Sequence, residues 1–371
     1  MSSPVPLSHR ALVLESTTAG FHLQTVPTPL PTPGSAVLQI LQAGIISYHR
    51  EIYDGTRHYA FPQPLVGGSS AIARVAALGP DAVALTVGQL VFVDCVVRGR
   101  DDPSELFLTA ISEGARAGSK KLFRDVWRDG VWAEYARMPL ENCVPLNEAR
   151  LCKELGYGVK ELMYLCHLLV PFGGLRDIKV EPGETVVVSP ATGGYGGAAV
   201  KVAVALGARV IAMGRDEGKL AALKEHVLKG APGASIETVR ITGDEKADTA
   251  ALMAFGTVDA VLDLSPPEAG KSTHLKSAVA ALRRGGRVSM MGFVDVPAAS
   301  WKLVGDDITL KGKLMYERED MFQFVKMLER GLYPKGKDLV DAKTFALEDW
   351  KEAMDVAAEY NGIGKLVSFA P

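Results

Sequence analysis

The chain has 371 residues, of which 47% are apolar and 23% are charged, a composition typical of a globular protein with room for two domains. Its 41 basic and 43 acidic side chains give a formal net charge of −2. This balance provides no general attraction to nucleic acid or to an anionic membrane, so we expect neither as a partner.

Hydrophobic and cysteine patterns argue against a secreted or membrane protein. Residues 1–10 lack the apolar segment of a secretory signal, and the most apolar stretch, Leu162–Val170, is too short to span a bilayer. The four cysteines are Cys95, Cys143, Cys152 and Cys166. None of them forms a C-x-x-C pair, so neither a disulfide framework nor a cysteine zinc site is indicated. We therefore expect a cytoplasmic protein.

The first third of the chain is predicted to be rich in β-strands. Apolar runs between turn residues indicate strands at Ala11–Leu14, Ala36–Ile45, Ala71–Leu78 and Gln89–Val93. Four prolines between residues 27 and 33 make that stretch a stiff, extended connector. Residues 98–128 are charged and poor in β-branched side chains, so we expect a loop there that carries a short helix.

From residue 185 onward, strands and helices are predicted to alternate. The expected strands are Thr185–Val188, Arg209–Met213, Ala260–Leu264 and Arg287–Met291. The expected helices are Ala198–Leu206 and Glu217–Leu228. Strand, helix and strand at this spacing predict an α/β domain with a parallel sheet. An amphipathic helix, Leu347–Tyr360, and a strand, Lys365–Phe369, are expected at the end of the chain.

A glycine-rich run lies between the first of these strands and the first helix. It reads Ala191, Thr192, Gly193, Gly194, Tyr195, Gly196 and Gly197. A pyrophosphate needs backbone N–H groups and a helix N-terminus at close range, and a Cβ in the turn would hold it away. The usual G-x-G-x-x-G fingerprint appears with alanine in its first position. We predict a dinucleotide-binding loop; the alternative is a tight turn without a ligand.

The end of the second strand in this domain indicates which dinucleotide binds. Enzymes that use NAD place a carboxylate there for the ribose 2′-hydroxyl. In this chain the position is Gly214, followed by Arg215, with Lys219 one helical turn further on. Glycine leaves space for a 2′-phosphate that a guanidinium can bind, which favours NADPH. In the alternative, Asp216 binds the ribose and the two cations form a solvated helix face.

With these residues the chain resembles the medium-chain dehydrogenase/reductase superfamily over nearly its whole length. The motifs that carry the resemblance are Gly79-Pro80, Val87–Val91, Asp129–Tyr135, Pro182–Val186, Gly193–Gly196, Leu206–Ala208, Val258–Asp263 and Gly285–Val288. The resemblance implies a GroES-like, β-rich catalytic domain at residues 1–165, to which residues 302–371 return. It implies a Rossmann domain with a doubly wound parallel sheet at residues 166–301, and a homodimer.

The resemblance also implies further cofactor contacts. It places Ser265, Gly292 and Phe293 beside the dinucleotide, with Phe293 near the nicotinamide. The alternative for Phe293 is simple packing.

The chain departs from the zinc-dependent members of that superfamily at the metal ligands. Ile46 stands where those members carry a cysteine, and Gly67-Gly68-Ser69 replaces their Gly-His-Glu. Cys95 stands alone where a structural zinc loop of four cysteines would begin. Catalytic zinc needs three protein ligands and structural zinc needs four, so we expect no metal.

The segment Ser47–Tyr59 is rich in hydrogen-bond donors, which a reductase without a metal needs in order to stabilise charge on the acceptor oxygen. The resemblance places Tyr48 where zinc members carry a proton-relaying Ser or Thr. Zinc-free enoyl reductases, which the chain also resembles, carry an acid tyrosine near the position of Arg57. Tyr59 lies two residues after that position. Tyr48 and then Tyr59 are therefore the candidate proton donors. The alternative for Tyr48 is that it fills space vacated by zinc.

These observations predict a zinc-independent, NADPH-dependent oxidoreductase. It would transfer hydride to an activated C=C bond or carbonyl in a small molecule of the enone, quinone or aldehyde type. Two alternatives stay open. One is a redox-neutral isomerase or cyclase on the same scaffold, and the other is a non-catalytic NADPH-binding protein.

Overall fold

The computed structural model describes residues 5–293 and 301–371, which form two compact units. The first unit contains the chain up to Cys166, together with Asp341–Asn361 and Leu366–Pro371. The second contains the described part of His167–Val340 and the short segment Gly362–Lys365. In the part of the chain that the structure describes, no helix has the length and apolar character needed to cross a membrane.

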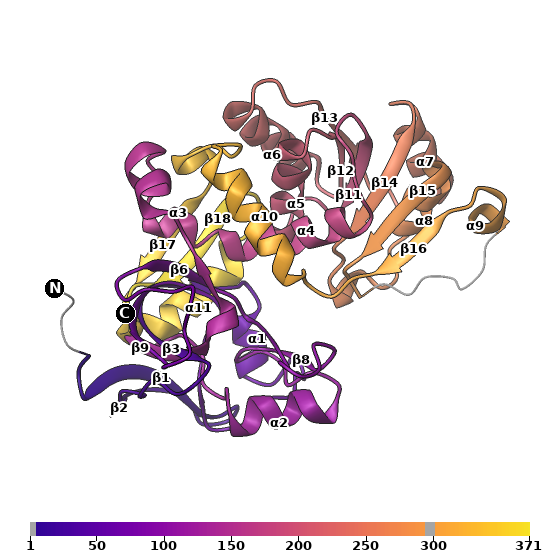
Figure 1. Cartoon of the computed structure of the whole chain (residues 1–371). Helices are drawn as coiled ribbons and strands as arrows, with labels where there is room; N and C mark the ends of the chain where they lie inside the picture. The colour runs from indigo at the N-terminus through magenta and orange to yellow at the C-terminus, as the bar shows by residue number, and fades with distance from the viewer. Residues whose placement is uncertain (1–4, 294–300) are drawn as a thin grey trace. The chain divides into compact units, whose positions relative to one another are not determined.

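The first unit is built mainly from antiparallel strands (Figure 1). Its strands are β1 (Ser8–Ser16), β2 (Gly20–Pro27), β3 (Ser35–Ile45), β4 (Leu65–Val66), β5 (Ala71–Leu78), β6 (Leu90–Val93), β7 (Val96–Arg98), β8 (Leu106–Leu108), β9 (Tyr135–Pro139), β10 (Cys143–Pro145), β17 (Asp341–Phe345) and β18 (Lys365–Phe369). Its helices are α1 (His49–Tyr53), α2 (Ala117–Asp125), α3 (Val159–Leu162) and α11 (Trp350–Glu359).

The largest sheet of this unit has the order β10-β6-β5-β3-β18-β17, and β9 also pairs with β3. β3 lies at its centre because it is apolar along most of its length and is buried on both faces. A smaller sheet, β2-β1-β4, packs on the same core, where the aromatic rings of Phe21, Tyr53 and Trp132 meet.

The second unit is a six-stranded, fully parallel sheet with the order β13-β12-β11-β14-β15-β16. Its strands are β11 (Thr185–Ser189), β12 (Arg209–Gly214), β13 (Ile236–Arg240), β14 (Val258–Asp263), β15 (Leu282–Met290) and β16 (Thr309–Gly312). Its helices are α4 (Leu165–Asp177), α5 (Gly194–Ala205), α6 (Glu217–Gly230), α7 (Glu245–Met253), α8 (His274–Ala281), α9 (Trp301–Gly305) and α10 (Arg318–Glu329).

The order of this parallel sheet determines where a ligand can bind. Every residue of β11 is buried, as in a strand covered by helices on both faces. The chain runs from β11 outward to β13 and then returns to β14 on the other side of β11. The direction of winding therefore reverses between β11 and β14. Doubly wound sheets bind their ligands beyond the carboxyl ends of strands at such a point.

Most expected elements are confirmed, and two of them, β5 and β18, have the expected bounds. α5 begins at Gly194, four residues earlier than expected, because glycines at a helix N-terminus adopt helical backbone without apolar periodicity. The half-exposed strand β2 was not expected. Residues 98–128 contain the expected helix, α2, and also β8, which pairs with β7.

The division into units differs from the expected domains between residues 302 and 340. We expected this stretch to return to the first domain, but it belongs to the second unit. β16 extends the parallel sheet by pairing with β15. The ring of Phe324 in α10 meets the ring of Phe172 in α4 at 5.1 Å. The return to the first unit therefore begins only at Asp341.

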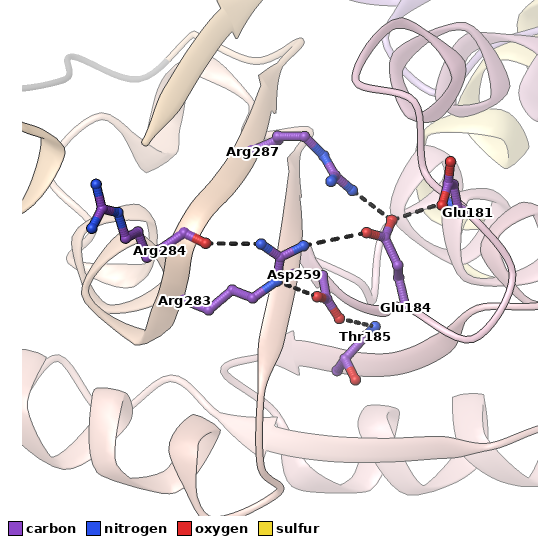
Figure 2. Close-up of polar contacts among 7 residues, drawn as sticks. All are labelled: Glu181, Glu184, Thr185, Asp259, Arg283, Arg284 and Arg287. Atoms are coloured by element: carbon purple, nitrogen blue, oxygen red, sulfur yellow. Dashed lines mark hydrogen bonds and ion pairs between the residues drawn. The ribbon is translucent and has the colours of Figure 1, made fainter. Parts of the chain in front are cut away.

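Ion pairs join the amino ends of three strands in the parallel sheet (Figure 2). Glu184, just before β11, accepts from Arg287 of β15 at 2.5 Å and pairs with Arg283 at 3.6 Å. Arg283 also donates to Asp259 of β14 at 2.5 Å, and Asp259 accepts from the backbone N–H of Thr185 at 2.8 Å. Glu184 and Asp259 are each only 15% exposed, so water screens these pairs weakly.

We expect Glu184→Gln to lower the free energy of unfolding by about 1–3 kcal/mol, because it leaves two arginines without their shared carboxylate. Urea unfolding followed by circular dichroism measures the change. The control is Asp307→Asn, which breaks the well-exposed pair with Arg284 and should change stability little. Equal effects of the two substitutions would contradict a special role for Glu184.

Candidate cofactor site and active site

The glycine run forms the turn between β11 and α5, as the sequence predicted. Gly193 is the residue before α5, is exposed, and would place a Cβ in open space. Its backbone is therefore open to a ligand at the N-terminus of a twelve-residue helix, where N–H groups and the helix dipole favour an anion. Ala191, which replaces the first fingerprint glycine, is fully buried, and its N–H donates to the Met213 carbonyl at 2.7 Å.

The later glycines of the run serve close packing. A Cβ at Gly196 would lie 2.9 Å from the carbonyl carbon of Ala191, and a Cβ at Gly197 would lie 2.6 Å from Cα of Ile363. Helix α5 can therefore approach both its own strand and the segment 362–365 only if these positions carry no side chain. This packing fixes the direction in which the N-terminus of α5 points.

Two side chains flank the start of α5. The ring of Tyr195 stacks on the ring of His167 in α4, with centroids 5.1 Å apart. Burial lowers the pKa of His167 to about 4. The imidazole is therefore neutral at physiological pH and adds no positive charge to the glycine turn. Thr192, which is half-buried, lies beside Gly214, where a Cβ would come within 2.9 Å of its methyl carbon.

The residues expected to distinguish the two cofactors lie at the end of β12. Gly214 is buried, whereas Arg215 and Lys219 are exposed. Asp216, the alternative ribose ligand, caps α6 by accepting from the backbone N–H of Lys219 at 2.9 Å. Arg240, which the sequence reasoning missed, ends β13 directly opposite Gly214 in the register. Three cations thus lie in the segments that adjoin the end of β12, and one of them, Arg240, pairs with Glu217 at 3.4 Å.

Ser265, Gly292 and Phe293 come together at the ends of β14 and β15. The Phe293 N–H donates to the Ser265 carbonyl at 2.9 Å, and a Cβ at Gly292 would lie 2.6 Å from a carboxylate oxygen of Asp263. Phe293 is 62% exposed, so it is not part of the core. The Ser265 hydroxyl points inward, where it contacts Asp263 at 2.5 Å and His274 at 2.7 Å.

That inward contact changes what Ser265 can offer to a cofactor. Ser265 is 2% exposed, and its hydroxyl is already occupied within the cluster with Asp263 and His274. The hydroxyl is therefore not open to a cofactor, and the Ser265 carbonyl accepts from the Phe293 N–H. His274 was not considered in the sequence analysis, since one histidine at the start of a helix carries no recognisable signal.

The two candidate proton donors lie in the first unit and are both half-buried against its core. Tyr48 immediately precedes α1, and the guanidinium carbon of Arg57 lies 4.2 Å from the centre of its ring. Tyr59 follows two residues after Arg57. The structure thus brings Tyr48 together with Arg57, which the sequence alone did not indicate as a site residue.

A third tyrosine in the donor-rich segment has a structural role. Tyr53 is buried, and its hydroxyl donates to the Ala110 carbonyl at 2.9 Å and accepts from the Gly68 N–H at 3.0 Å. Burial raises its pKa well above the ordinary value. Its ring meets those of His49 and Trp132 at 5.5 and 5.3 Å.

Trp132 determines what can stand at residues 67 and 68. A Cβ at Gly67 would lie 2.7 Å from Cε3 of the indole, and one at Gly68 would lie 2.6 Å from its Cγ and even closer to its Cδ1. Gly68 also has φ +89°, a left-handed conformation that side chains disfavour. The indole is fully buried and donates to the Gly44 carbonyl at 3.2 Å. Position 68 is therefore restricted to glycine.

Comparison with known proteins supports the same two-part organisation. Residues 32–148 match the alcohol dehydrogenase GroES-like domain, and residues 194–330 match the zinc-binding dehydrogenase family. The L-threonine 3-dehydrogenase of Ruegeria pomeroyi is 26% identical over 96% of this chain and 98% of its own length. The acryloyl-coenzyme A reductase of Sulfurisphaera tokodaii is 24% identical over 96% of this chain and 99% of its own length.

A solved structure shows the same fold. The short chain alcohol dehydrogenase of Escherichia coli CFT073, complexed with NADH, matches with a TM-score of 0.77 at 19% identity, over 99% of this chain and 100% of that chain.

A GroES-like unit followed by a parallel dinucleotide-binding sheet defines a class of two-domain dehydrogenases and reductases. The chain belongs to the medium-chain dehydrogenase/reductase superfamily and is a nicotinamide-dependent oxidoreductase of that type. The expected fold class, a GroES-like domain with a Rossmann-type domain, is confirmed.

The family match raises the question of zinc, and the residues at the expected ligand positions do not fit that metal. Ile46 is buried and apolar, and Gly68 has no side chain and no room for one. Among residues 5–293 and 301–371, no three His, Cys, Asp or Glu side chains gather as a metal ion would require. Ile46 and Gly68 therefore offer zinc no side-chain ligand.

We expect Gly68→Ala to destabilise the chain more than Gly88→Ala. Both glycines have φ near +90°, but a Cβ at Gly88 would meet nothing within 4 Å. Each substitution should cost about 1–2 kcal/mol from the left-handed backbone, and Gly68→Ala should add about 1–3 kcal/mol from overlap with Trp132. Thermal unfolding of both variants measures the difference, and equal melting temperatures would contradict the tight packing.

Proposed function

We propose that this chain is a zinc-independent, NADPH-dependent reductase that passes hydride to an activated C=C bond or carbonyl. The observation that carries the proposal is the contrast between the two units. The second unit retains the dinucleotide-binding turn, with Gly193 open at the N-terminus of α5. In the first unit, the residues at the metal-ligand positions that the resemblance implies are Ile46 and Gly68. Ile46 is buried and apolar, and Trp132 leaves no room for a side chain at Gly68.

NADPH is supported by the environment of Gly214. A 2′-phosphate carries negative charge, which Arg215, Lys219 and Arg240 would attract, and Gly214 presents no carboxylate that would repel it. The capping bond that Asp216 accepts from the start of α6 disfavours its use as a ribose ligand. When bound, NADPH supplies the hydride. The glycine turn would bind its pyrophosphate through backbone N–H groups.

We expect Arg215→Ala to weaken NADPH binding by about 10–100-fold while leaving NADH binding nearly unchanged, because only NADPH carries the 2′-phosphate. Fluorescence titration of both reduced dinucleotides measures the affinities. The control is Lys224→Ala in α6, the helix that follows Arg215, since Lys224 already pairs with Glu237 at 2.9 Å. An equal loss of NADH affinity in Arg215→Ala would contradict a 2′-phosphate site.

The proposed acceptors are enones, quinones and aldehydes, in which hydride addition places negative charge on an oxygen. The chain shares its fold and a similar degree of identity with alcohol and threonine dehydrogenases and with an acryloyl-coenzyme A reductase. The superfamily therefore includes both alcohol oxidation and C=C reduction. Tyr48 is the proposed proton donor, with Tyr59 as the second candidate. A small-molecule substrate and the homodimer that the resemblance implies complete the proposal.

We expect the wild-type chain to oxidise NADPH when an enone, quinone or aldehyde from a panel is added, with decay of absorbance at the reduced-nicotinamide band. Tyr48→Phe should lower kcat by about 100-fold, in the range of general acid catalysis, and leave NADPH affinity intact. Tyr360→Phe is the control, because that hydroxyl contacts Asp341 at 2.6 Å and has no proposed role.

Three other outcomes would redirect the proposal. Product formation without a change in absorbance would favour the redox-neutral isomerase or cyclase. NADPH binding with no reaction of any acceptor would favour a non-catalytic NADPH-binding protein. Unchanged turnover in Tyr48→Phe would remove Tyr48 from the mechanism.

A further inference from the structure

Arg57 is an unusual side chain in the first unit because it is largely buried but only partly paired. Its side chain is 14% exposed. Nη1 donates to a carboxylate oxygen of Glu51 at 2.8 Å, and the guanidinium carbon lies 4.2 Å from the centre of the Tyr48 ring. Nε is buried and has no hydrogen-bond partner among the described residues.

The loop that carries Arg57 is held in place by its own hydrogen bonds. The Arg57 N–H donates to the Glu51 carbonyl at 2.9 Å, and the Thr56 hydroxyl donates to Asp54 at 2.6 Å. Gly55 and His58 adopt φ of +84° and +53°, so the chain reverses sharply on both sides of Arg57. The guanidinium is therefore positioned by a compact turn after α1 rather than by a free surface loop.

The pairing of this guanidinium is incomplete. A guanidinium has five N–H donors, and Glu51 engages one nitrogen with a carboxylate that is itself 48% exposed. A buried donor without a partner is destabilising, so an acceptor that reaches it is bound favourably. The Glu51 contact leaves the side of the fork that contains Nε, which arginine uses to bind a carboxylate through two parallel hydrogen bonds. On this side, Nε has no acceptor among the residues that the structure describes.

We propose that Arg57, stacked on Tyr48, binds an anionic oxygen of the substrate. That oxygen is either a carboxylate of the substrate or the carbonyl oxygen that gains negative charge when hydride is added. Both are acceptors that match the fork of the guanidinium, and the ring of Tyr48 lies against the same guanidinium. Binding of an anion follows from the contacts of Arg57 alone, whereas its use in catalysis rests on the proposed reductase function.

Calorimetric titration tests the anion site without any turnover, with benzoate as the probe and benzamide as its uncharged analogue. Wild-type protein should bind benzoate, and Arg57→Met should weaken that binding at least tenfold. Glu51→Gln should strengthen it, because the competing carboxylate is removed. Arg50→Met is the control, since Arg50 is exposed and paired with Asp355 at 2.7 Å. Benzamide should bind all four proteins alike.

Several results would overturn the anion site. Absence of benzoate binding to the wild-type protein would contradict the site. Equal benzoate affinity in wild type and Arg57→Met would contradict it as well. Weaker binding in Glu51→Gln would show that the Arg57–Glu51 pair only supports the loop. Thermal unfolding shows whether each variant is folded, and Arg57→Lys, which keeps the charge without the fork, should bind benzoate with intermediate affinity.

Reduction of 4-oxo-2-pentenoate and of its methyl ester distinguishes the two sources of the anionic oxygen. If Arg57 binds a substrate carboxylate, Arg57→Met should raise KM for the acid by at least tenfold and leave the ester unchanged. If Arg57 holds the acceptor oxygen, kcat should fall similarly for both compounds. No effect on either compound would overturn a catalytic use. Absence of turnover in the wild type would count against the reductase function, while the benzoate titration still decides the anion site.

Discussion

The contact between the Trp132 indole and the backbone of Gly67 and Gly68 is the constraint on which the first unit depends. It bars a side chain at residue 68, and the indole N–H also holds the Gly44 carbonyl in β3. The Gly68 N–H in turn donates to Tyr53, which anchors α1 within the aromatic core. This packing therefore joins β3, α1 and the turn at residues 67–68 to Trp132, which lies far along the chain from all three.

This constraint also shapes the chemistry open to the chain. Three aromatic residues and a buried histidine pack together around Trp132, so dispersion and ring contacts stabilise this part of the first unit. In the proposed reductase, the bound dinucleotide would supply the hydride. Tyr48 and Arg57 of the first unit are the proposed donors that would stabilise negative charge on the acceptor oxygen.

Local patterns in the sequence predicted most of the strands and the dinucleotide turn, because apolar periodicity and glycine spacing act over a few residues. Features that depend on distant residues were not accessible. Trp132 reaches Gly68 across 64 positions, and only its packing shows why glycine is required there. The Ser265 hydroxyl is occupied by His274, which no spacing rule relates to it. Residues 302–340 belong to the second unit through contacts with distant elements, namely the pairing of β16 with β15 and the ring contact between α10 and α4.

The order of strands in the first unit has a consequence for how the chain is made. β18, at residues 365–369, pairs with β3, at residues 35–45, inside the same sheet. A ribosome releases β3 long before β18, so residues 43–45 of β3 lack their partner strand until β18 emerges. The parallel sheet of the second unit is complete by residue 312 and needs no later strand. Synthesis from the N-terminus therefore favours a second unit that completes its sheet before the first one does.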